Sequence, residues 1–408
     1  MKNGRLFLVA LLVATFGLSA WADVNWPTFR GPAGTGVSSD AKPPVKWSES
    51  KNVKWKIELP GDGNSSPIVW QDKIFLQTAV PADDEQVKFD LLCVNRTDGS
   101  IVWQQTASQA RPHEGHHSDH GYASFSPVTD GKHVWINYGS QGVYCYDFSG
   151  RQVWKAPMPQ MQTRRAFGEG SSPALAGDML IVVADQERNS VVYALDKRTG
   201  KEIWKKSRRE RTNWTSPLVV THGDRTQIVV GGTTFISYDP ANGNTLWTSS
   251  GHTQNVIPTP IYAHGLIYCL SGFRGSMCRV IRPDDGSKVW EITEHTPYVP
   301  SGIVANGKFY FGSRNRVSVS CYNATDGKAH FKNQRLGESS GMYASPVAAN
   351  GHIYFTGRDG VVIVIKDDGS ASPVAQNTLD DRIDATPALV DNQIIIRGKE
   401  KLYCIADS

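Results

Sequence analysis

Four histidines lie within eight positions of the stretch HEGHHSDHGYAS, residues 113–124. Its first five residues have the spacing H-E-x-x-H, in which two histidines one helical turn apart bind zinc and the glutamate acts as general base. That chemistry needs a helix, but a proline precedes the motif, Gly115 lies inside it and SDHGYAS follows it. The sequence therefore argues against a zinc protease. A looser metal site on His116, His117 and His120 remains an alternative to an ordered loop whose histidines are hydrogen-bonded or contact a ligand.

The composition indicates a large core interrupted by many turns. The chain has 408 residues, 39% of them hydrophobic, with 38 glycines and 22 prolines. Its formal net charge is +4. Removing residues 1–22 takes away two basic and no acidic residues, which leaves +2. This charge is too small for a general nucleic-acid binder.

The first 22 residues have the pattern of a secretory signal peptide. Lys2 and Arg5 precede the apolar run LFLVALLVATFGLSA, and small residues stand before Asp23. We therefore expect an exported protein, periplasmic or extracellular, that begins near Asp23. No later run reaches the roughly 18 to 20 apolar residues that span a bilayer, and no cysteine stands at the cleavage site. These features predict a soluble product without a transmembrane segment or a lipid anchor.

An internal repeat organises most of the chain. The unit SSPALAGDMLIVVADQERNSVVYALDKRTGKEIWKK, residues 171–206, contains four short β-rich runs separated by turn residues, which predicts a four-stranded antiparallel sheet. A small hydroxyl residue, usually followed by proline, begins each copy. These anchors are Ser66, Ser126, Ser172, Ser216, Thr259, Ser301, Ser345 and Thr386. Their intervals of 60, 46, 44, 43, 42, 44 and 41 residues are close to the roughly 40 to 50 residues of a propeller blade.

A second recurring element is a turn that ends in glycine, with an aromatic residue four positions later. Glycine suits the positive φ of such a turn, and the aromatic ring covers the sheet behind it. The pairs are Gly99/Trp103, Gly150/Trp154, Gly200/Trp204, Gly243/Trp247, Gly286/Trp290 and Gly327/Phe331.

The last repeat supplies only three strands before the sequence stops at Ser408. The segment NVKWKIELP, residues 52–60, has the pattern of the missing fourth strand. The sequence therefore predicts an all-β, eight-bladed β-propeller of four-stranded antiparallel blades, closed by an N-terminal strand. In this interpretation residues 1–22 are the signal peptide, residues 23–51 form an N-terminal extension and residues 52–408 form the propeller.

The repeats ALDKRTGKEIW, SYDPANGNTLW and CYDFSGRQVW resemble those of pyrroloquinoline-quinone (PQQ) dehydrogenases and of their non-enzymatic relatives, which include the outer-membrane assembly lipoprotein BamB. The stretches WPTFRGPAGTGVS and HGYASFSPVTDG resemble secreted PQQ-like propeller proteins of planctomycete-type bacteria. The resemblance implies a quinoprotein-dehydrogenase-like fold and says much less about function.

The enzymes of that family place two adjacent cysteines against the quinone, and they bind Ca²⁺ with carboxylate and amide side chains. This sequence has no adjacent cysteines and no C-x-x-C-H of a cytochrome module. No catalytic residue is therefore transferred by the resemblance, and no cofactor is expected. PQQ with Ca²⁺ remains the alternative.

The positions of the six cysteines indicate a role in packing and not in catalysis. Five of them fall in the third strand of their repeats, where a small residue is required, and are expected to be buried thiols. These are Cys93, Cys145, Cys278, Cys321 and Cys404. Cys269 and Cys278 flank a turn and, in an oxidising compartment, either form a disulfide across the hairpin or stay reduced.

The loops that join strands two and three, and those that join blades, emerge on one face around the channel; we call this the front face. They carry many arginines, which suit anionic groups and protein backbone, although acidic residues in the same loops allow plain ion pairs instead. An alternative role for Trp214 and Tyr343, instead of ligand binding, is to cover a hydrophobic edge. The candidate ligand-binding residues are Asn64, His116, His117, His120, Tyr122, Arg164, Arg165, Glu169, Trp214, Asn255, Arg274, Tyr298, Tyr343 and Asp384.

These observations favour an exported, non-catalytic binding or scaffold propeller. Its partly cationic front funnel is expected to take a protein, a peptide, or an anionic or polysaccharide ligand. The alternative is a PQQ- or metal-dependent oxidoreductase. Aromatic residues in the front loops also leave a glycan-processing or glycan-binding function open.

Overall fold

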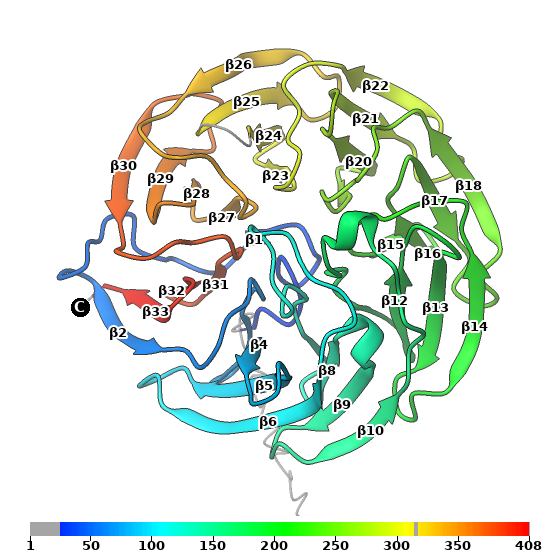
Figure 1. Cartoon of the computed structure of the whole chain (residues 1–408). Helices are drawn as coiled ribbons and strands as arrows, with labels where there is room; N and C mark the ends of the chain where they lie inside the picture. Colours follow the sequence, from blue (N-terminus) through cyan, green and yellow to red (C-terminus); the bar gives the residue numbers. More distant parts are fainter. Residues whose placement is uncertain (1–24, 314–316, 408) are drawn as a thin grey trace, which may run out of the picture.

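The computed structural model describes residues 25–313 and 317–407. Within these ranges, eight antiparallel sheets stand around a central axis like the blades of a propeller (Figure 1). The predicted all-β, eight-bladed fold is confirmed. The predicted signal peptide, residues 1–22, lies outside the described residues.

Each blade takes its strands in sequence order from the axis outward. Blade one comprises β3 (Ile68–Trp70), β4 (Lys73–Pro81), β5 (Val87–Asn95) and β6 (Ile101–Ala110), and blade two comprises β7 (Val128–Thr129), β8 (His133–Asn137), β9 (Val143–Asp147) and β10 (Gln152–Ala156). Blade three comprises β11 (Ala174–Ala176), β12 (Met179–Ala184), β13 (Val191–Asp196) and β14 (Glu202–Ser207). Blade four comprises β15 (Leu218–His222), β16 (Arg225–Val230), β17 (Thr234–Tyr238) and β18 (Thr245–Ser250). Two 3-10 turns, η1 (Gly139–Gln141) and η2 (Arg164–Ala166), interrupt the loops.

Blade five comprises β19 (Ile261–Ala263), β20 (Leu266–Ser271), β21 (Met277–Ile281) and β22 (Lys288–Ile292). Blade six comprises β23 (Ile303–Ala305), β24 (Lys308–Gly312), β25 (Ser318–Asn323) and β26 (Ala329–Arg335). Blade seven comprises β27 (Val347–Ala349), β28 (His352–Thr356), β29 (Val361–Lys366) and β30 (Pro373–Thr378). A short parallel strand, β1 (Val37–Ser38), adds to the inner edge of blade seven.

Blade eight joins the two ends of the described chain. Its first three strands are β31 (Ala388–Val390), β32 (Gln393–Arg397) and β33 (Lys401–Ala406). The outer strand is β2 (Val53–Glu58), which pairs antiparallel with β33, so that Trp55 lies opposite Cys404. This is the closure that the incomplete last repeat predicted.

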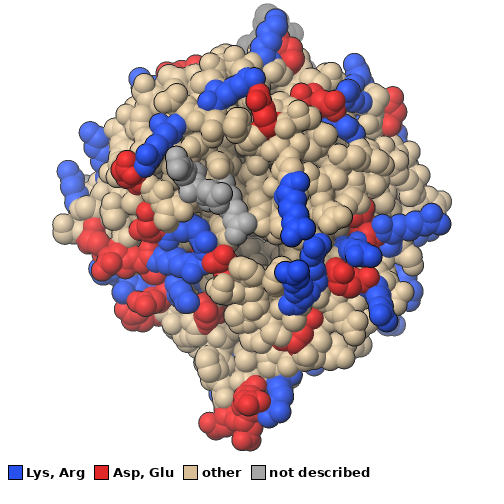
Figure 2. Space-filling model, turned by 45° about the horizontal axis from the view of Figure 1, so that its top comes forward, with Lys and Arg blue, Asp and Glu red and all other residues tan. Residues whose placement is uncertain are grey.

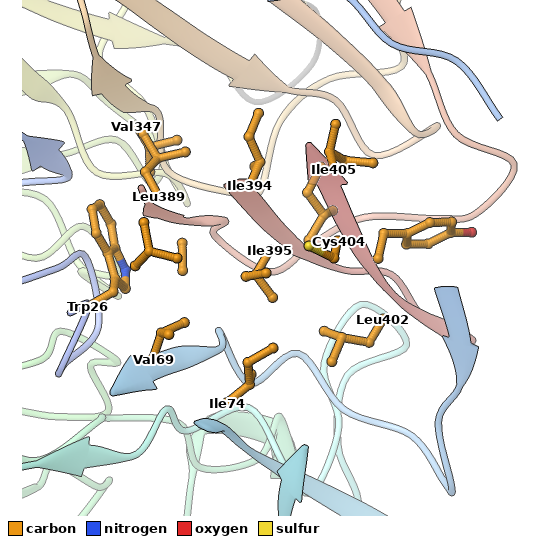
Figure 3. Packing of buried hydrophobic residues seen from close by; sticks show 14 of the residues in the cluster. Trp26, Val69, Ile74, Val347, Leu389, Ile394, Ile395, Leu402, Cys404 and Ile405 are labelled. Carbon is orange, nitrogen blue, oxygen red and sulfur yellow. The ribbon is translucent and has the colours of Figure 1, made fainter. Parts of the chain in front are cut away.

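The core lies between neighbouring blades, because both faces of the inner and middle strands are covered. In β12 nearly every residue is buried, whereas the outermost strand β14 exposes most of its charged residues. Around blade eight, Ile394 and Ile405 lie toward blade seven, and Ile395 and Leu402 lie toward blade one (Figure 3). Each blade therefore depends on both neighbours for burial of its apolar side chains.

The eight anchors form a closed ring of hydrogen bonds around the axis. The backbone N–H of each anchor donates to the side-chain hydroxyl of the anchor in the next blade. The ring closes when the N–H of Thr386 donates to Oγ of Ser66 at 2.9 Å. The successive donor–acceptor pairs, at 2.9 to 3.3 Å, are Ser66 to Ser126, Ser126 to Ser172, Ser172 to Ser216, Ser216 to Thr259, Thr259 to Ser301, Ser301 to Ser345, and Ser345 to Thr386. The recurring hydroxyl is thus an inter-blade acceptor.

Six tryptophans connect the blades at larger radius. The indole of Trp247 in blade four, for example, packs on Gly286 of blade five and donates its N–H to the carbonyl oxygen of Pro283 at 2.7 Å. Gly286 has φ of +73°, and an added Cβ would lie 2.8 Å from the indole, so the turn needs glycine for its conformation and for this contact. The other five donor–acceptor pairs are Trp55 to Arg96, Trp103 to Phe148, Trp154 to Lys197, Trp204 to Pro240 and Trp290 to Ala324.

Residues 25–38 cross the central channel. Trp26 exchanges backbone hydrogen bonds with Val69 of blade one, and Pro27 accepts the N–H of Thr129 in blade two. The guanidinium of Arg30 donates to Gly302 in blade six, and Gly36 accepts the N–H of Ala348 in blade seven. This segment, which we call the plug, therefore contacts the innermost strands around the axis. The sequence predicts only an N-terminal extension here.

The disulfide considered for Cys269 and Cys278 is wrong. Both thiols are free and buried. In the pairing of β20 with β21, Cys278 lies opposite Leu270 and Cys269 lies opposite Arg279. Adjacent positions of a strand point to opposite faces, so the two sulfur atoms pack in different cores, one on each side of blade five.

We predict that Trp247→Ala destabilises the fold by about 3–5 kcal/mol, because the substitution leaves a cavity and removes an inter-blade hydrogen bond. Urea unfolding followed by fluorescence measures the change. Val153→Ala on the outer strand β10, where Val153 is 42% exposed, is the control and should stay within about 0.5 kcal/mol of the wild type. Equal stability of the two variants would contradict the role of the tryptophans.

Candidate functional site

The central channel opens on the front face as a funnel of about 410 Å³. All eight anchors line it, and Phe29 of the plug contributes to its lining. Figure 2 shows Lys and Arg side chains on both sides of the hollow at the centre of this face. The plug bonds to Val69, Thr129 and Ala348, each three residues after an anchor along its inner strand, so it lies beyond the anchor ring on the side away from the front loops.

Ten of the fourteen predicted site residues line this funnel. They are Asn64, His117, His120, Arg164, Arg165, Trp214, Arg274, Tyr298, Tyr343 and Asp384. The other four lie close by but outside it. Asn255 accepts a hydrogen bond from Arg164 at 3.1 Å. Glu169 and Tyr122 line a smaller neighbouring cavity, and the exposed His116 packs against Tyr122.

Sequence reasoning missed several lining residues. Phe29 comes from the plug, whose path no strand pattern reveals, although WPTFRGP is unusually aromatic for a polar extension. Asp119 lies inside the histidine loop, between residues that were considered. Phe273 stands directly before the predicted Arg274. The remaining missed wall residues are Ser124, Phe167, Gly170, Ile257 and Val299.

Three arginines form one wall of the funnel, which we call the arginine wall: Arg164, Arg165 and Arg274. The guanidinium groups of Arg164 and Arg274 lie 5.6 and 5.3 Å from the ring centroid of Phe273. Arg165 and Arg274 are exposed. Among the residues that the structure describes, the ion pairs of the funnel involve other arginines and none of these three.

The backbone is strained where the arginine wall is presented. Arg165 and Ala166 both have positive φ, at 52° and 53°, and Arg274 has φ of 53°. Non-glycine residues in this region cost free energy and concentrate at binding and catalytic sites. The strained backbone thus includes Arg165 and Arg274, two of the three residues of the arginine wall.

The opposite wall is held by an ion-pair network that includes the histidine loop. The carboxylate of Asp119 accepts hydrogen bonds from Arg358 at 2.7 Å, Arg382 at 3.0 Å and the Tyr343 hydroxyl at 2.8 Å. Arg358 also pairs with Asp384 at 2.8 Å. Burial raises the pKa of Asp384 to about 6 against the opposing effect of Arg358. Through Asp119, the loop that joins blades one and two is fastened to the loops of blades seven and eight.

The alternative of plain ion pairs therefore applies to part of the front face. Arg208 pairs with Asp185 at 2.9 Å with both side chains fully buried, and Arg358 is paired as described above. These arginines are structural. The arginine wall is not part of that network.

The histidine loop is not helical, as predicted, and His116, His117 and His120 do not converge on a metal site. His116 Nδ1 contacts the carbonyl oxygen of His117 at 2.9 Å, and His117 Nδ1 accepts the N–H of Asp119 at 3.1 Å. His120 Nδ1 lies 2.5 Å from the Ser124 hydroxyl, and burial lowers the pKa of His120 to about 4. Each histidine is thus engaged inside its own loop.

A different group from this loop does come together. Ligand atoms of His113, Glu114 and Glu169 lie within 4.8 Å of one another. Both carboxylates already order neighbouring loops: Glu114 accepts hydrogen bonds from the N–H and hydroxyl of Thr163, and Glu169 from those of Ser140. Glu114 of the motif and Glu169 therefore hold the loops around the funnel in place.

Burial raises the pKa of Glu169 to about 7, against the effect of the Ser140 hydrogen bonds. The folded state then keeps a proton that the unfolded state releases above about pH 4.5, so stability falls as pH rises from 4.5 to 7. We predict that Glu169→Gln removes this fall, which amounts to about 3 kcal/mol. Thermal unfolding between pH 4 and 8 tests it, with the exposed Glu202→Gln as control; an unchanged pH profile in Glu169→Gln would refute the assignment.

The funnel does not supply the groups that PQQ and Ca²⁺ need in the dehydrogenases. All six cysteines are buried in five different blades. Within the described residues, the carboxylates that line the funnel are Asp119 and Asp384, and both are already paired with arginines. A cation would have to displace those guanidinium groups, so this donor set does not fit a Ca²⁺–quinone complex.

Fold and funnel together define a PQQ-like eight-bladed β-propeller with a front pocket. The family model described as outer membrane protein assembly factor BamB matches residues 87–210, 188–318 and 274–407, and the chain belongs to this family. A search of curated proteins found no match.

Solved structures share the fold at low sequence identity. BamB from Moraxella catarrhalis is 14% identical with a TM-score of 0.62, over 86% of this chain and 98% of that chain. A europium-containing methanol dehydrogenase is 10% identical with a TM-score of 0.70, over 94% and 98%. The quinohemoprotein alcohol dehydrogenase from Comamonas testosteroni is 11% identical with a TM-score of 0.71, over 95% and 81%. An assembly factor and two dehydrogenases thus share this fold, so the fold alone does not identify the function.

In the described part of the chain, no helix has the length and apolar character that a membrane crossing would require.

Proposed function

We propose that this protein is an exported, non-catalytic binding propeller whose funnel takes an anionic ligand. The observation that carries the proposal is the arginine wall: three guanidinium groups on strained loops face a pocket and have no carboxylate partner among the described residues. Guanidinium forks suit carboxylate, sulfate and phosphate groups. Desolvation inside a concave site strengthens such contacts relative to the open surface.

The size and shape of the funnel support a compact ligand or the end of a chain. A volume of about 410 Å³ lies within the roughly 300–1,000 Å³ of small-molecule pockets. Aromatic side chains of the lining, among them Trp214, Phe273 and Tyr298, add apolar surface. The signal-peptide pattern supports export, and membership of the BamB family supports a scaffold that works through binding.

We predict that the double variant Arg165→Glu/Arg274→Glu weakens binding of polygalacturonate and of poly-glutamate at least tenfold, because charge reversal replaces attraction by repulsion. Retention on columns that carry each polymer, at low salt and at 0.15 M salt, measures the effect. Arg151→Glu, on the exposed turn between β9 and β10, is the control and should bind like the wild type. Equal retention of all three proteins would overturn the proposal.

The second candidate is a PQQ- or metal-dependent oxidoreductase, which the likeness to methanol and alcohol dehydrogenases favours. The binding hypothesis predicts no stoichiometric quinone after incubation with PQQ and Ca²⁺. Absorbance spectra and metal analysis of the repurified protein test this. One quinone per chain, together with alcohol-dependent dye reduction, would overturn the non-catalytic proposal.

A further inference from the structure

The eight anchor hydroxyls at the base of the funnel have unused donor capacity. Each hydroxyl oxygen accepts one backbone N–H of the ring. Within residues 25–313 and 317–407, none of these eight hydroxyls donates a hydrogen bond to a protein acceptor. A serine or threonine hydroxyl offers one donor and two acceptor sites. Eight O–H groups therefore remain available around the axis.

These hydroxyls are buried and belong to the funnel. All eight anchors are at most 7% exposed, and all eight line the cavity. A buried donor without an acceptor is costly, so the groups need oxygen acceptors from water or from a ligand. The ring thus presents a circle of donors to whatever fills the base of the funnel.

A buried positive charge lies beside this ring. Arg30 in the plug is fully buried, and its Nη2 donates to Gly302, the residue after the anchor Ser301. Its Nε and Nη1 atoms have no partner among the described residues. Burial lowers the pKa of Arg30 to about 9, which leaves it protonated at neutral pH. Arg30 does not line the cavity itself; its charge lies next to the ring and adds a positive potential to the hydroxyl donors at the base of the funnel.

The arrangement favours a ring-shaped, oxygen-rich ligand over a peptide end. A sugar presents oxygen atoms around its whole edge and an apolar face that packs on aromatic rings. A peptide C-terminus presents two carboxylate oxygens at one point, and its backbone N–H groups need acceptors. In the funnel the side chains of Asp119 and Asp384 are already engaged by arginines. A circle of donors with Phe29 at its base matches the sugar better.

We propose that the funnel binds the end of an acidic polysaccharide, with the terminal sugar against Phe29 and the ring of anchor hydroxyls and with uronic-acid carboxylates on the arginine wall. This inference rests on the proposed function and names its ligand class.

Isothermal titration of the full mature chain with three trimers tests the ligand class. The probes are tri-galacturonic acid, its methyl-esterified form, which keeps the sugars but loses the charges, and tri-glutamate, which keeps three carboxylates without sugars. We expect tri-galacturonic acid to bind one per chain, and each of the other two to bind at least tenfold more weakly.

Two substitutions at one anchor test the ring. Thr386→Val removes the hydroxyl with little change of shape, and Thr386→Ser keeps it. We expect Thr386→Val to bind tri-galacturonic acid at least fivefold more weakly than Thr386→Ser. Circular dichroism and thermal unfolding at the titration temperature show that each variant is folded. Equal affinities of two folded variants would remove the ring from the site. Should Thr386→Val not fold, Phe29→Leu, which removes the aromatic face but keeps an apolar side chain, takes its place with the same expected loss.

The remaining outcomes separate this inference from the proposed function. Binding of tri-glutamate as tight as that of tri-galacturonic acid would overturn the saccharide assignment and leave the anionic funnel standing. Equal binding of the methyl-esterified trimer would overturn the anionic funnel itself. If no trimer binds, the inference fails, and the proposed function then depends on the polymer-retention result alone.

Discussion

The hydrogen bond between a backbone N–H and the hydroxyl of the next anchor is the contact on which the rest of this structure depends. It repeats eight times and returns to its starting blade, so each blade is held to two neighbours at the axis. A buried amide that loses this acceptor is left without its protein partner, which costs free energy. The same atoms set the width of the channel and form the base of the funnel. Stability and the proposed binding surface therefore depend on one set of residues.

In the outer part of the molecule, tryptophan side chains also connect each blade to its neighbour. Six indoles pack on glycine turns of the following blade and donate their N–H groups to its carbonyl oxygens. The inner ring and the outer tryptophans together hold neighbouring blades in place. The front loops divide into two walls. One is held by Asp119 and Asp384 with their arginines, and the other presents arginines that pair with no carboxylate in the described part of the chain.

Much of the fold follows from the sequence because repetition reveals it. The anchor spacing predicts eight blades, and the incomplete last repeat predicts that residues 52–60 close the ring; both are confirmed. The plug was beyond such reasoning, because Phe29 and Arg30 belong to an irregular segment without a repeat partner. The disulfide considered for Cys269 and Cys278 does not form, because the strand register places the two thiols on opposite faces of the blade. The sequence alone does not give this register. For the site, loop position placed most candidates near the funnel. Which arginines are paired depends on distances that periodicity does not contain, as Arg358 and Arg274 illustrate.

We propose that the anchor ring, the plug and the arginine wall form one anion-binding funnel. A crystal structure of the protein soaked with tri-galacturonic acid tests this arrangement. We expect carboxylate density within hydrogen-bond distance of Arg165 or Arg274 and sugar density over Phe29 inside the ring of anchor hydroxyls. A saccharide bound on another face, with the funnel filled by ordered water alone, would contradict it.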